Sequence, residues 1–174
     1  METRGRPGQA LACGFGGPWD EQTMSESNEY PGMTGYPVVN RITVQWGDLD
    51  AYGHVNNVVY LKWFEATRAD YARRVGVEVL DRNQGIGAIL TSIHCDYRRQ
   101  LAYPGEVLSG VRITRISIGS VTLEFLIADA TTGVPIAQGG CDVVLYSYAD
   151  DKPVPVPDDI RRNVEKLEGR EFSV

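Results

Sequence analysis

The 174-residue sequence has no stretch dense in lysine or arginine, and its acidic residues outnumber its basic ones. Aspartate and glutamate total 23 against 17 lysines and arginines, which gives a net charge of −6 at pH 7. Bulk binding to nucleic acid requires a basic surface that attracts the phosphate backbone. The composition therefore disfavours a nucleic-acid partner. A small anionic substrate stays compatible with it, because a local group of arginines is enough to bind one.

Cysteine is scarce, and its positions disfavour two common roles. Cys13, Cys95 and Cys141 are odd in number and widely separated. This pattern matches neither a disulfide framework nor a structural zinc site. We therefore expect no bound metal and a reducing, cytoplasmic location.

Long apolar runs are missing as well. No segment approaches the length of a membrane span, so we expect no membrane partner. Residues 1–36 are rich in glycine, proline, serine and acidic residues, and they lack the apolar region of a secretory signal. They are predicted to be a flexible N-terminal tail. Met24 and Met33 lie within this tail, which leads to the hypothesis that the protein starts downstream of Met1.

The most informative stretch is a loop between a strand and a helix. An alternating strand is predicted to end at Trp46, and Asp48, Asp50 and Gly53 follow before an Asn-Asn pair at residues 56–57. Asparagine is a favoured N-cap, and the pattern turns helical directly afterwards. The loop thus places a carboxylate close to a helix N-terminus, which offers unpaired N–H donors. A carboxylate beside such donors can attack a carbonyl that they polarise, or direct water at it.

The remaining pattern predicts one long helix and a run of strands. Apolar residues at helical spacing indicate a helix from residue 57 to about 75, ended by Gly76. Alternation and turn residues then predict four strands joined by short turns, over about residues 89–103, 106–118, 121–130 and 134–148. Prolines 153, 155 and 157 are expected to end the sheet, before a short helix over about residues 160–167 capped by Asp158 or Asp159.

This order of elements predicts an α+β fold, in which a five-stranded antiparallel sheet curves around one central helix. The expected organisation is a tail over residues 1–36, one domain over residues 37–150, and a proline-rich segment with a short helix over residues 151–174. A single helix covers one face of the sheet. We therefore expect the other face, or the edges of the sheet, to meet a second protomer.

The sequence resembles a known family, the hotdog-fold acyl-CoA thioesterases of the 4-hydroxybenzoyl-CoA thioesterase type. The resemblance covers about residues 38–148, and it depends on Trp46-Gly47-Asp48-Leu49-Asp50-Ala51-Tyr52-Gly53-His54-Val55-Asn56-Asn57, Tyr60-Leu61, Phe64-Glu65, Asp96-Tyr97-Arg98-Arg99 and Tyr103-Pro104-Gly105-Glu106. It implies a hotdog fold, a dimer joined edge to edge and often paired again into a tetramer, and active sites between protomers. The family's catalytic aspartate matches Asp50, and its carbonyl-polarising backbone N–H matches that of Asn57.

Asp50 has two interpretations. As a loop residue it can accept backbone N–H groups in an Asx-turn or cap the helix. As the residue that matches the catalytic aspartate, it is expected to be either a general base towards water or a nucleophile that forms a transient anhydride. The sequence leaves these two chemical roles open. We interpret Asp48 as structural, because it can hold the loop through backbone N–H groups.

Two further side chains are candidate catalytic residues. His54 can shuttle protons or orient a carboxylate near neutral pH, or it can stabilise the loop by a hydrogen bond. Glu65 lies two turns beyond Asn57 on the same helix face, where some hotdog enzymes place a catalytic carboxylate, so it is the alternative base. Its structural interpretation is an ion pair with Arg68. The side chains of Asn56 and Asn57 are expected to cap the helix, which is compatible with a role for the Asn57 backbone.

Substrate binding is assigned to Tyr60, Arg98 and Arg99. Tyr60 belongs to the helix part of the family motif, and the arginines, with Arg112 and Arg115, can bind the phosphates of coenzyme A. The structural interpretation of the arginines is a solvated strand face. Alternation along a strand would send Arg98 and Arg99 to opposite faces of the sheet.

The predicted function is hydrolysis of an acyl-CoA or acyl-carrier-protein thioester, with no metal or bound cofactor. A thiol pKa of about 8.5 makes the thiolate a good leaving group, so no strong general acid is needed. Two alternatives stay open: a non-catalytic acyl-CoA-binding module that serves as a sensor, and a hotdog enoyl-CoA hydratase or dehydratase that pairs His54 with a carboxylate. The acyl group itself is not specified by the sequence.

Overall fold

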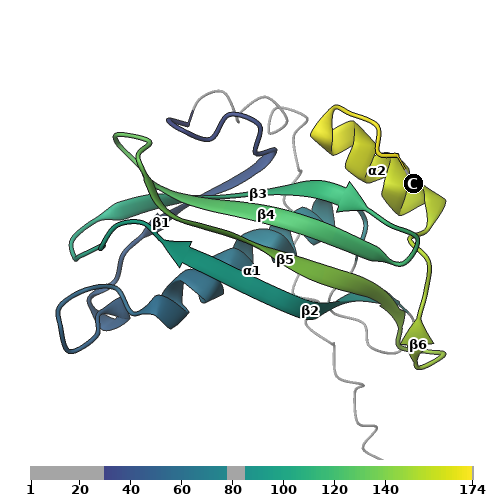
Figure 1. Ribbon diagram of the computed structural model, residues 1–174, viewed down its shortest axis with the longest axis horizontal. Helices are drawn as coiled ribbons and strands as arrows, with labels where there is room; N and C mark the ends of the chain where they lie inside the picture. The colour runs from purple at the N-terminus through teal and green to yellow at the C-terminus, as the bar shows by residue number, and fades with distance from the viewer. Residues whose placement is uncertain (1–29, 78–84, 174) are drawn as a thin grey trace, which may run out of the picture.

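One antiparallel sheet wraps around one long helix in the computed structural model, which describes residues 30–77 and 85–173 (Figure 1). In chain order the elements are β1 (Val38–Thr43), the short 3-10 helix η2 (Trp46–Asp48), α1 (Asn57–Arg74), β2 (Ile86–Tyr97), β3 (Glu106–Ile116), β4 (Ser120–Asp129), β5 (Pro135–Ser147), β6 (Lys152–Pro153) and α2 (Asp158–Glu168). The strand order is β1-β3-β4-β5-β2, and β6 pairs with β5. This is the predicted hotdog architecture with one short strand added.

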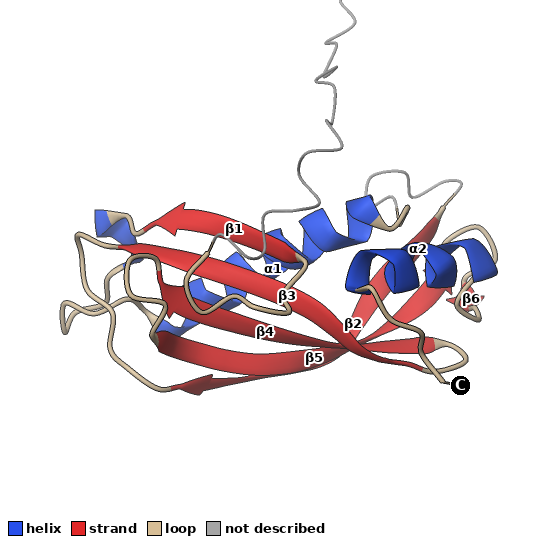
Figure 2. Ribbon diagram, turned by 90° about the horizontal axis from the view of Figure 1, so that it is seen from above, coloured by secondary structure: helices blue, strands red, loops and turns tan. Residues whose placement is uncertain are grey.

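The inner face of the sheet packs on α1 and forms the main core. Phe64 of α1 stacks on Phe125 of β4, with 3.3 Å between the ring centroids. Two polar side chains are also buried here, and they satisfy each other: the hydroxyl oxygens of Thr67 and Ser109 lie 2.8 Å apart. α2 extends this core near the end of α1, where Ile160 and Val164 are buried. Figure 2 shows α2 lying beside β3.

The outer face of the sheet is partly covered by the chain itself. Met33 and Tyr36 are buried against Leu108 of β3 and Leu126 of β4. Residues 30–36 were expected to belong to a flexible tail, so this packing corrects the predicted boundary. The rest of the predicted tail, residues 1–29, lies outside the described residues.

Two strand ends and one proline position differ from the sequence predictions. β1 ends at Thr43 rather than Trp46, and the Trp46 side chain is 77% exposed in η2. β2 ends at Tyr97, well before residue 103. Pro153 lies within β6, so the first of the three prolines does not end the sheet; it occupies an edge strand, where a missing N–H is tolerated.

The helices match their predictions more closely. α1 spans Asn57–Arg74 and is followed by Gly76, whose φ of 90° suits glycine. α2 begins two residues earlier than expected, and its N-cap is Pro157, with Asp158 and Asp159 in the first turn instead of at the cap. None of the helices in the described part of the chain is both long and apolar enough to span a membrane.

Candidate active site

The loop before α1 is built around Asp50, and the two carboxylate oxygens of this residue have different surroundings. Oδ1 accepts the backbone N–H groups of Tyr52 (2.8 Å) and His54 (3.3 Å). The backbone N–H of Asp50 also donates to the carbonyl of His54 at 2.8 Å, and Gly53 has a φ of 77° that closes the turn. Oδ2 accepts no hydrogen bond from the described residues. The Asx-turn interpretation is therefore confirmed, and one oxygen is still available for chemistry.

Asp48 holds the other side of the same loop. Its carboxylate accepts the N–H of Gln45 at 2.8 Å, and its carbonyl accepts the N–H of Asn56 at 2.9 Å. Both bonds fix the position of the loop relative to the start of α1. The structural interpretation of Asp48 is confirmed.

Among the described residues, the start of α1 presents a backbone N–H without an acceptor. Asn56, rather than Asn57, is the N-cap, because its side-chain oxygen accepts the N–H of Val58 at 3.0 Å. Asn57 is the first helical residue, and within residues 30–77 and 85–173 its N–H has no acceptor. The hydroxyl of Tyr97 donates to the carbonyl of Asn57 at 3.0 Å and so ties the helix start to β2.

A hollow of about 320 Å³ brings most of the predicted site residues together. Its lining includes six of them: Asp50, His54, Asn57, Tyr60, Arg98 and Arg99. The remaining lining residues are Val55, Tyr97, Gln100 and Leu101. A carboxylate, a helix N-terminus and two cations thus meet in one depression of the surface.

Arg98 and Arg99 line the same hollow, which corrects the expectation that they point to opposite faces. Alternation applies only inside a strand, and β2 ends at Tyr97. The backbone N–H groups of both arginines donate to the carbonyl of Ile136, at 2.8 and 3.1 Å. The chain turns there, so both residues border the hollow at the start of α1.

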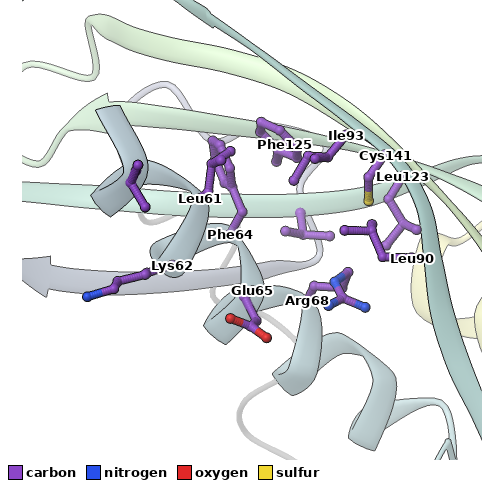
Figure 3. A pocket seen from close by; sticks show the side chains of 12 residues that line it. Leu61, Lys62, Phe64, Glu65, Arg68, Leu90, Ile93, Leu123, Phe125 and Cys141 are labelled. Atoms are coloured by element: carbon purple, nitrogen blue, oxygen red, sulfur yellow. The ribbon is translucent and has the colours of Figure 1, made fainter. Parts of the chain in front are cut away.

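Glu65 is not part of this hollow. It is exposed on α1 and lines a second cavity of about 280 Å³ between α1 and the sheet, together with Arg68 (Figure 3). The expected ion pair between Glu65 and Arg68 is not formed among the described residues. The structure therefore separates the alternative base from the other candidates.

Burial raises the pKa of two side chains at or near the wall of the hollow. Tyr60 is buried, which raises the pKa of its hydroxyl to about 12, and its ring meets that of Tyr97 edge to face at 5.2 Å between centroids. Burial also raises the pKa of the neighbouring Cys95 thiol, with a smaller opposing effect from its hydrogen bond to Tyr97. Cys95 is therefore a neutral thiol near pH 7, and a role as nucleophile is disfavoured.

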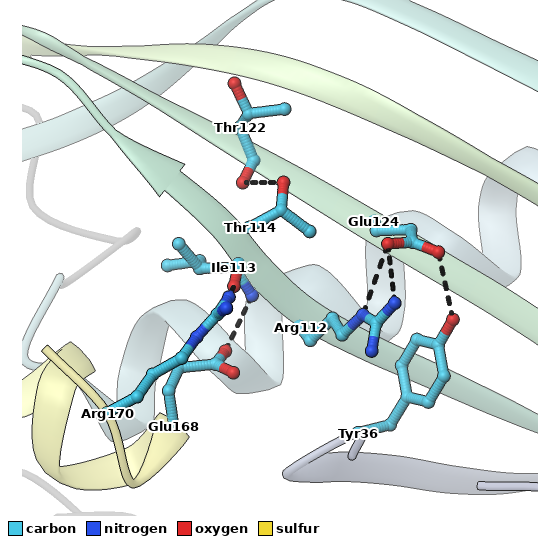
Figure 4. Close-up of polar contacts among 8 residues, drawn as sticks. All are labelled: Tyr36, Arg112, Ile113, Thr114, Thr122, Glu124, Glu168 and Arg170. Atoms are coloured by element: carbon cyan, nitrogen blue, oxygen red, sulfur yellow. Dashed lines mark hydrogen bonds and ion pairs between the residues drawn. The ribbon is translucent and has the colours of Figure 1, made fainter. Parts of the chain in front are cut away.

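The two other arginines considered for coenzyme A lie elsewhere. Arg112 donates to Glu124 at 2.8 and 3.2 Å and lies over the ring of Tyr36 on the outer face (Figure 4). Arg115 donates to Thr122 at 3.4 Å. Neither lines the hollow at Asp50, so their interpretation is structural.

Sequence reasoning did not single out Tyr97 as a site residue. Its hydroxyl contacts the Asn57 carbonyl only because β2 runs beside the helix start, a tertiary neighbourhood that local spacing does not reveal. In the described part of the chain, no group of three or more His, Cys, Asp or Glu side chains is placed to hold a metal ion.

Comparison with known proteins shows the superfamily of the chain. A sequence model of the thioesterase-like superfamily matches residues 44–164, which is more than half of the chain. The chain belongs to this superfamily.

Individual relatives are similar over most of the domain. A thioesterase from Thermus thermophilus, crystallised with coenzyme A and zinc, is 32% identical, with 80% of this chain and 100% of that chain covered and a TM-score of 0.72. A predicted thioesterase from Bacillus stearothermophilus is 26% identical over 79% of this chain and 98% of that chain, with a TM-score of 0.68. The uncharacterized protein YsmA of Bacillus subtilis (strain 168) is 27% identical over 126 residues, which cover 72% of this chain and 84% of that protein.

Proposed function

We propose that this protein hydrolyses acyl-CoA thioesters, with Asp50 as the catalytic carboxylate and the N-terminus of α1 as the group that polarises the carbonyl. The observation that carries this proposal is that Asp50 and Asn57 line one hollow, and that neither Oδ2 of Asp50 nor the N–H of Asn57 has a hydrogen-bond partner among the described residues. The Thermus relative, which binds coenzyme A, supports this choice of thiol. An acyl-carrier-protein thioester presents the same reacting group.

In this mechanism the thioester carbonyl oxygen accepts the N–H of Asn57 at the positive end of the helix dipole. Either Asp50 Oδ2 takes a proton from water while the water oxygen attacks the carbonyl carbon, or Oδ2 attacks the carbon itself and water then hydrolyses the anhydride. In both routes the C–S bond breaks, the electron pair leaves on sulfur, and the products are the free acid and coenzyme A. The proposal needs no bound cofactor.

The remaining predicted residues have supporting positions in this proposal. Arg98 and Arg99 are exposed at the rim of the hollow, where they can bind the phosphates of coenzyme A. Arg98 approaches Asp96 only at 4.0 Å, so neither guanidinium is held in a close ion pair within the described residues. Tyr60 forms part of the wall, and the imidazole of His54 is close enough to the hollow to assist proton transfer.

We also propose that the protein is a dimer, or a dimer of dimers, joined through β2. This strand is at one edge of the sheet, and its exposed backbone edge can pair with a second copy. Leu90 and Ile93 on β2 are exposed apolar residues, which a partner would cover. Such a dimer would place the two hollows near the junction. Cys95 and Cys141 are free thiols, consistent with the cytoplasmic location that we propose.

A thiol-release assay over short, long and aromatic acyl-CoA thioesters tests the proposed function. We expect release of coenzyme A from at least one of these substrates. Binding of acyl-CoA without release would instead favour the sensor module. Loss of enoyl absorbance with crotonyl-CoA, without thiol release, would favour the hydratase in which His54 acts with a carboxylate.

A further inference from the structure

An apolar strip of exposed side chains leads away from the hollow at Asp50. Nine large apolar side chains are exposed among the described residues, and four of them lie where α1 faces β2: Val58, Leu90, Ile93 and Tyr97. Tyr97 lines the hollow, whereas Val58, Ile93 and Leu90 line the second cavity. Because exposed apolar side chains gather here, next to the β2 edge that we propose as the junction with a second copy, the strip marks a binding surface that begins beside the catalytic groups and lies at this junction.

The strip leads into the second cavity, which we call the α1–β2 groove. The volume of this groove is about 280 Å³. Its floor is made of buried apolar side chains, among them Phe64, Leu123 and Phe125. Figure 3 shows these side chains gathered between α1 and the sheet, with Lys62 pointing away from them. The volume and lining suit an extended apolar chain or one ring.

Arg68 is a charged residue within this otherwise apolar part of the groove lining. Its side chain is half-buried and lies beside Leu90 in Figure 3. Within the described ranges, no hydrogen bond or ion pair engages its guanidinium, and Glu65 on the preceding turn is not in ion-pair contact with it. Lys62 and Glu65 also border the groove, but Figure 3 shows their charged ends directed away from the apolar floor. The guanidinium of Arg68 is therefore the charged group placed to meet a negatively charged group in the groove.

The spacing between Arg68 and the reaction centre fits one molecule. Arg68 is eleven residues after Asn57 on α1, which corresponds to about 16 Å along the helix axis. The long, flexible side chain of Arg68 can turn back along the groove and cover part of this length. An acyl chain of medium length can span the rest.

We propose that the α1–β2 groove holds the acyl part of the substrate and that Arg68 binds a carboxylate at its far end. The substrate class is then an ω-carboxyacyl thioester, with an apolar middle. This inference rests on the proposed thioesterase function and adds the class of acyl group to it.

Paired substrates test this assignment without changing the reacting bond. Rates of thiol release are compared for adipyl-CoA against hexanoyl-CoA, suberyl-CoA against octanoyl-CoA, and 4-carboxybenzoyl-CoA against benzoyl-CoA. For at least one pair, we expect the wild-type protein to prefer the carboxylated member in kcat/KM. Arg68→Gln should lower that preference on the order of 10- to 100-fold, mostly through KM, because it removes a charge-assisted hydrogen bond.

Two further variants separate a specific contact from general damage. Arg68→Lys keeps the charge and should restore part of the preference. Lys62→Gln removes an exposed cation of the same helix that points away from the apolar floor, and it should leave the preference unchanged. Binding of adipyl-CoA and hexanoyl-CoA to Asp50→Asn protein gives a second readout that does not depend on turnover.

The outcomes are distinguishable. Turnover with no preference for carboxylated substrates, or a preference that Arg68→Gln leaves intact, overturns this inference and leaves the thioesterase function standing. An equal loss on all substrates, together with dissociation of the oligomer, would show that Arg68 contacts a second copy and would also overturn it. Absence of thiol release from every substrate would overturn the proposed function itself, and with it this inference.

Discussion

At the scale of single residues, the two carboxylate oxygens of Asp50 have different roles: Oδ1 is structural, and Oδ2 is proposed to be catalytic. Oδ1 holds the loop through the N–H groups of Tyr52 and His54, whereas Oδ2 is free among the described residues. An asparagine at this position can keep the loop, because its amide oxygen can replace Oδ1. It cannot act as a base or as a carboxylate nucleophile. Asp50→Asn is therefore a cleaner substitution than Asp50→Ala.

Arg99 offers a residue-scale prediction about the thiol half of the substrate. Its exposed guanidinium at the rim of the hollow is expected to bind a phosphate of coenzyme A. Arg99→Gln should raise KM for an acyl-CoA by about tenfold and leave kcat almost unchanged. The matched control is the same acyl group on N-acetylcysteamine, a thiol without phosphates. An equal rise in KM for that thioester would contradict phosphate binding by Arg99.

The sequence predicts the site residues that are close together along the chain. The Asp-x-Asp pair, Gly53 and the Asn-Asn cap are local, so Asp50 and the free N–H of Asn57 could both be expected beside the start of α1. The neighbourhood of Arg98 and Arg99 could not, because it depends on where β2 ends. The contact of Tyr97 with Asn57 depends on the position of a strand forty residues away.

At the scale of elements, α2 is tied to the sheet by residues at its C-terminal end. The carboxylate of Glu168 accepts the N–H of Ile113 at 2.6 Å (Figure 4). It also accepts the hydroxyl of Tyr71 at 2.7 Å. Arg170 donates to the carbonyl of Ile113 at 2.6 Å. The pairing of β3 with β1 stops at Val111, which is opposite Val38, the first residue of β1. Glu168 and Arg170 therefore supply hydrogen-bond partners to the backbone of Ile113, where β3 has no neighbouring β1 residue.

Glu168 also predicts a pH dependence of stability. Burial raises the pKa of this carboxyl, against opposing effects of the Ile113 N–H, the Tyr71 hydroxyl and nearby arginines. Because its pKa is higher in the folded than in the unfolded state, its contribution to stability is present at acid pH and is lost as pH rises through the folded pKa. Glu168→Gln has no such titration. The free energy of unfolding of the wild type, measured relative to Glu168→Gln by urea titration, should therefore fall from acid to neutral pH.

The exposed Glu171 is the control for this measurement. The difference between wild type and Glu171→Gln should change little over the same pH range. A wild type that gains stability relative to Glu168→Gln as pH rises would contradict the assigned direction of the pKa shift.

Elements with a strong local sequence pattern were predictable, and elements that depend on tertiary pairing were not. The periodicity of α1 and the turn at Thr131 to Gly133 specify their positions well. Trp46 continues the alternation of β1 but is exposed, because the chain turns into η2 after the last pairing with β3 at Thr43. β6 exists only through its pairing with Tyr146 and Ser147 of β5, which no local pattern indicates.

At the scale of the whole molecule, the two faces of the sheet are covered differently. α1 and α2 cover the inner face, and residues 30–36 cover part of the outer face. The latter contact is possible because Gly110 leaves room for Met33, so a side chain there would clash with its sulfur at 2.7 Å. A glycine-rich segment without periodicity gives no sequence signal for such packing.

The proposed dimer predicts that β2 is sensitive to charge. Ile93 on β2 is 39% exposed, and Ile118 beside the β3–β4 turn is 72% exposed. Ile93→Asp should shift the protein to monomer, because a partner would bury this charge. Ile118→Asp, an equal change on a more exposed residue, should leave the oligomer intact. Light scattering coupled to size-exclusion chromatography gives the masses, and dissociation by Ile118→Asp alone would place the interface elsewhere.

The central claim is that Asp50 performs the chemistry in the hollow at the start of α1. The most direct measurement is kcat for thiol release by wild type, Asp50→Asn and Glu65→Gln, with acyl-CoA affinity measured in parallel. We predict that Asp50→Asn lowers kcat by about 10²–10⁴-fold while binding is retained, and that Glu65→Gln retains most of the activity. Unchanged turnover in Asp50→Asn together with loss of turnover in Glu65→Gln would contradict the account and move the reaction to the α1–β2 groove.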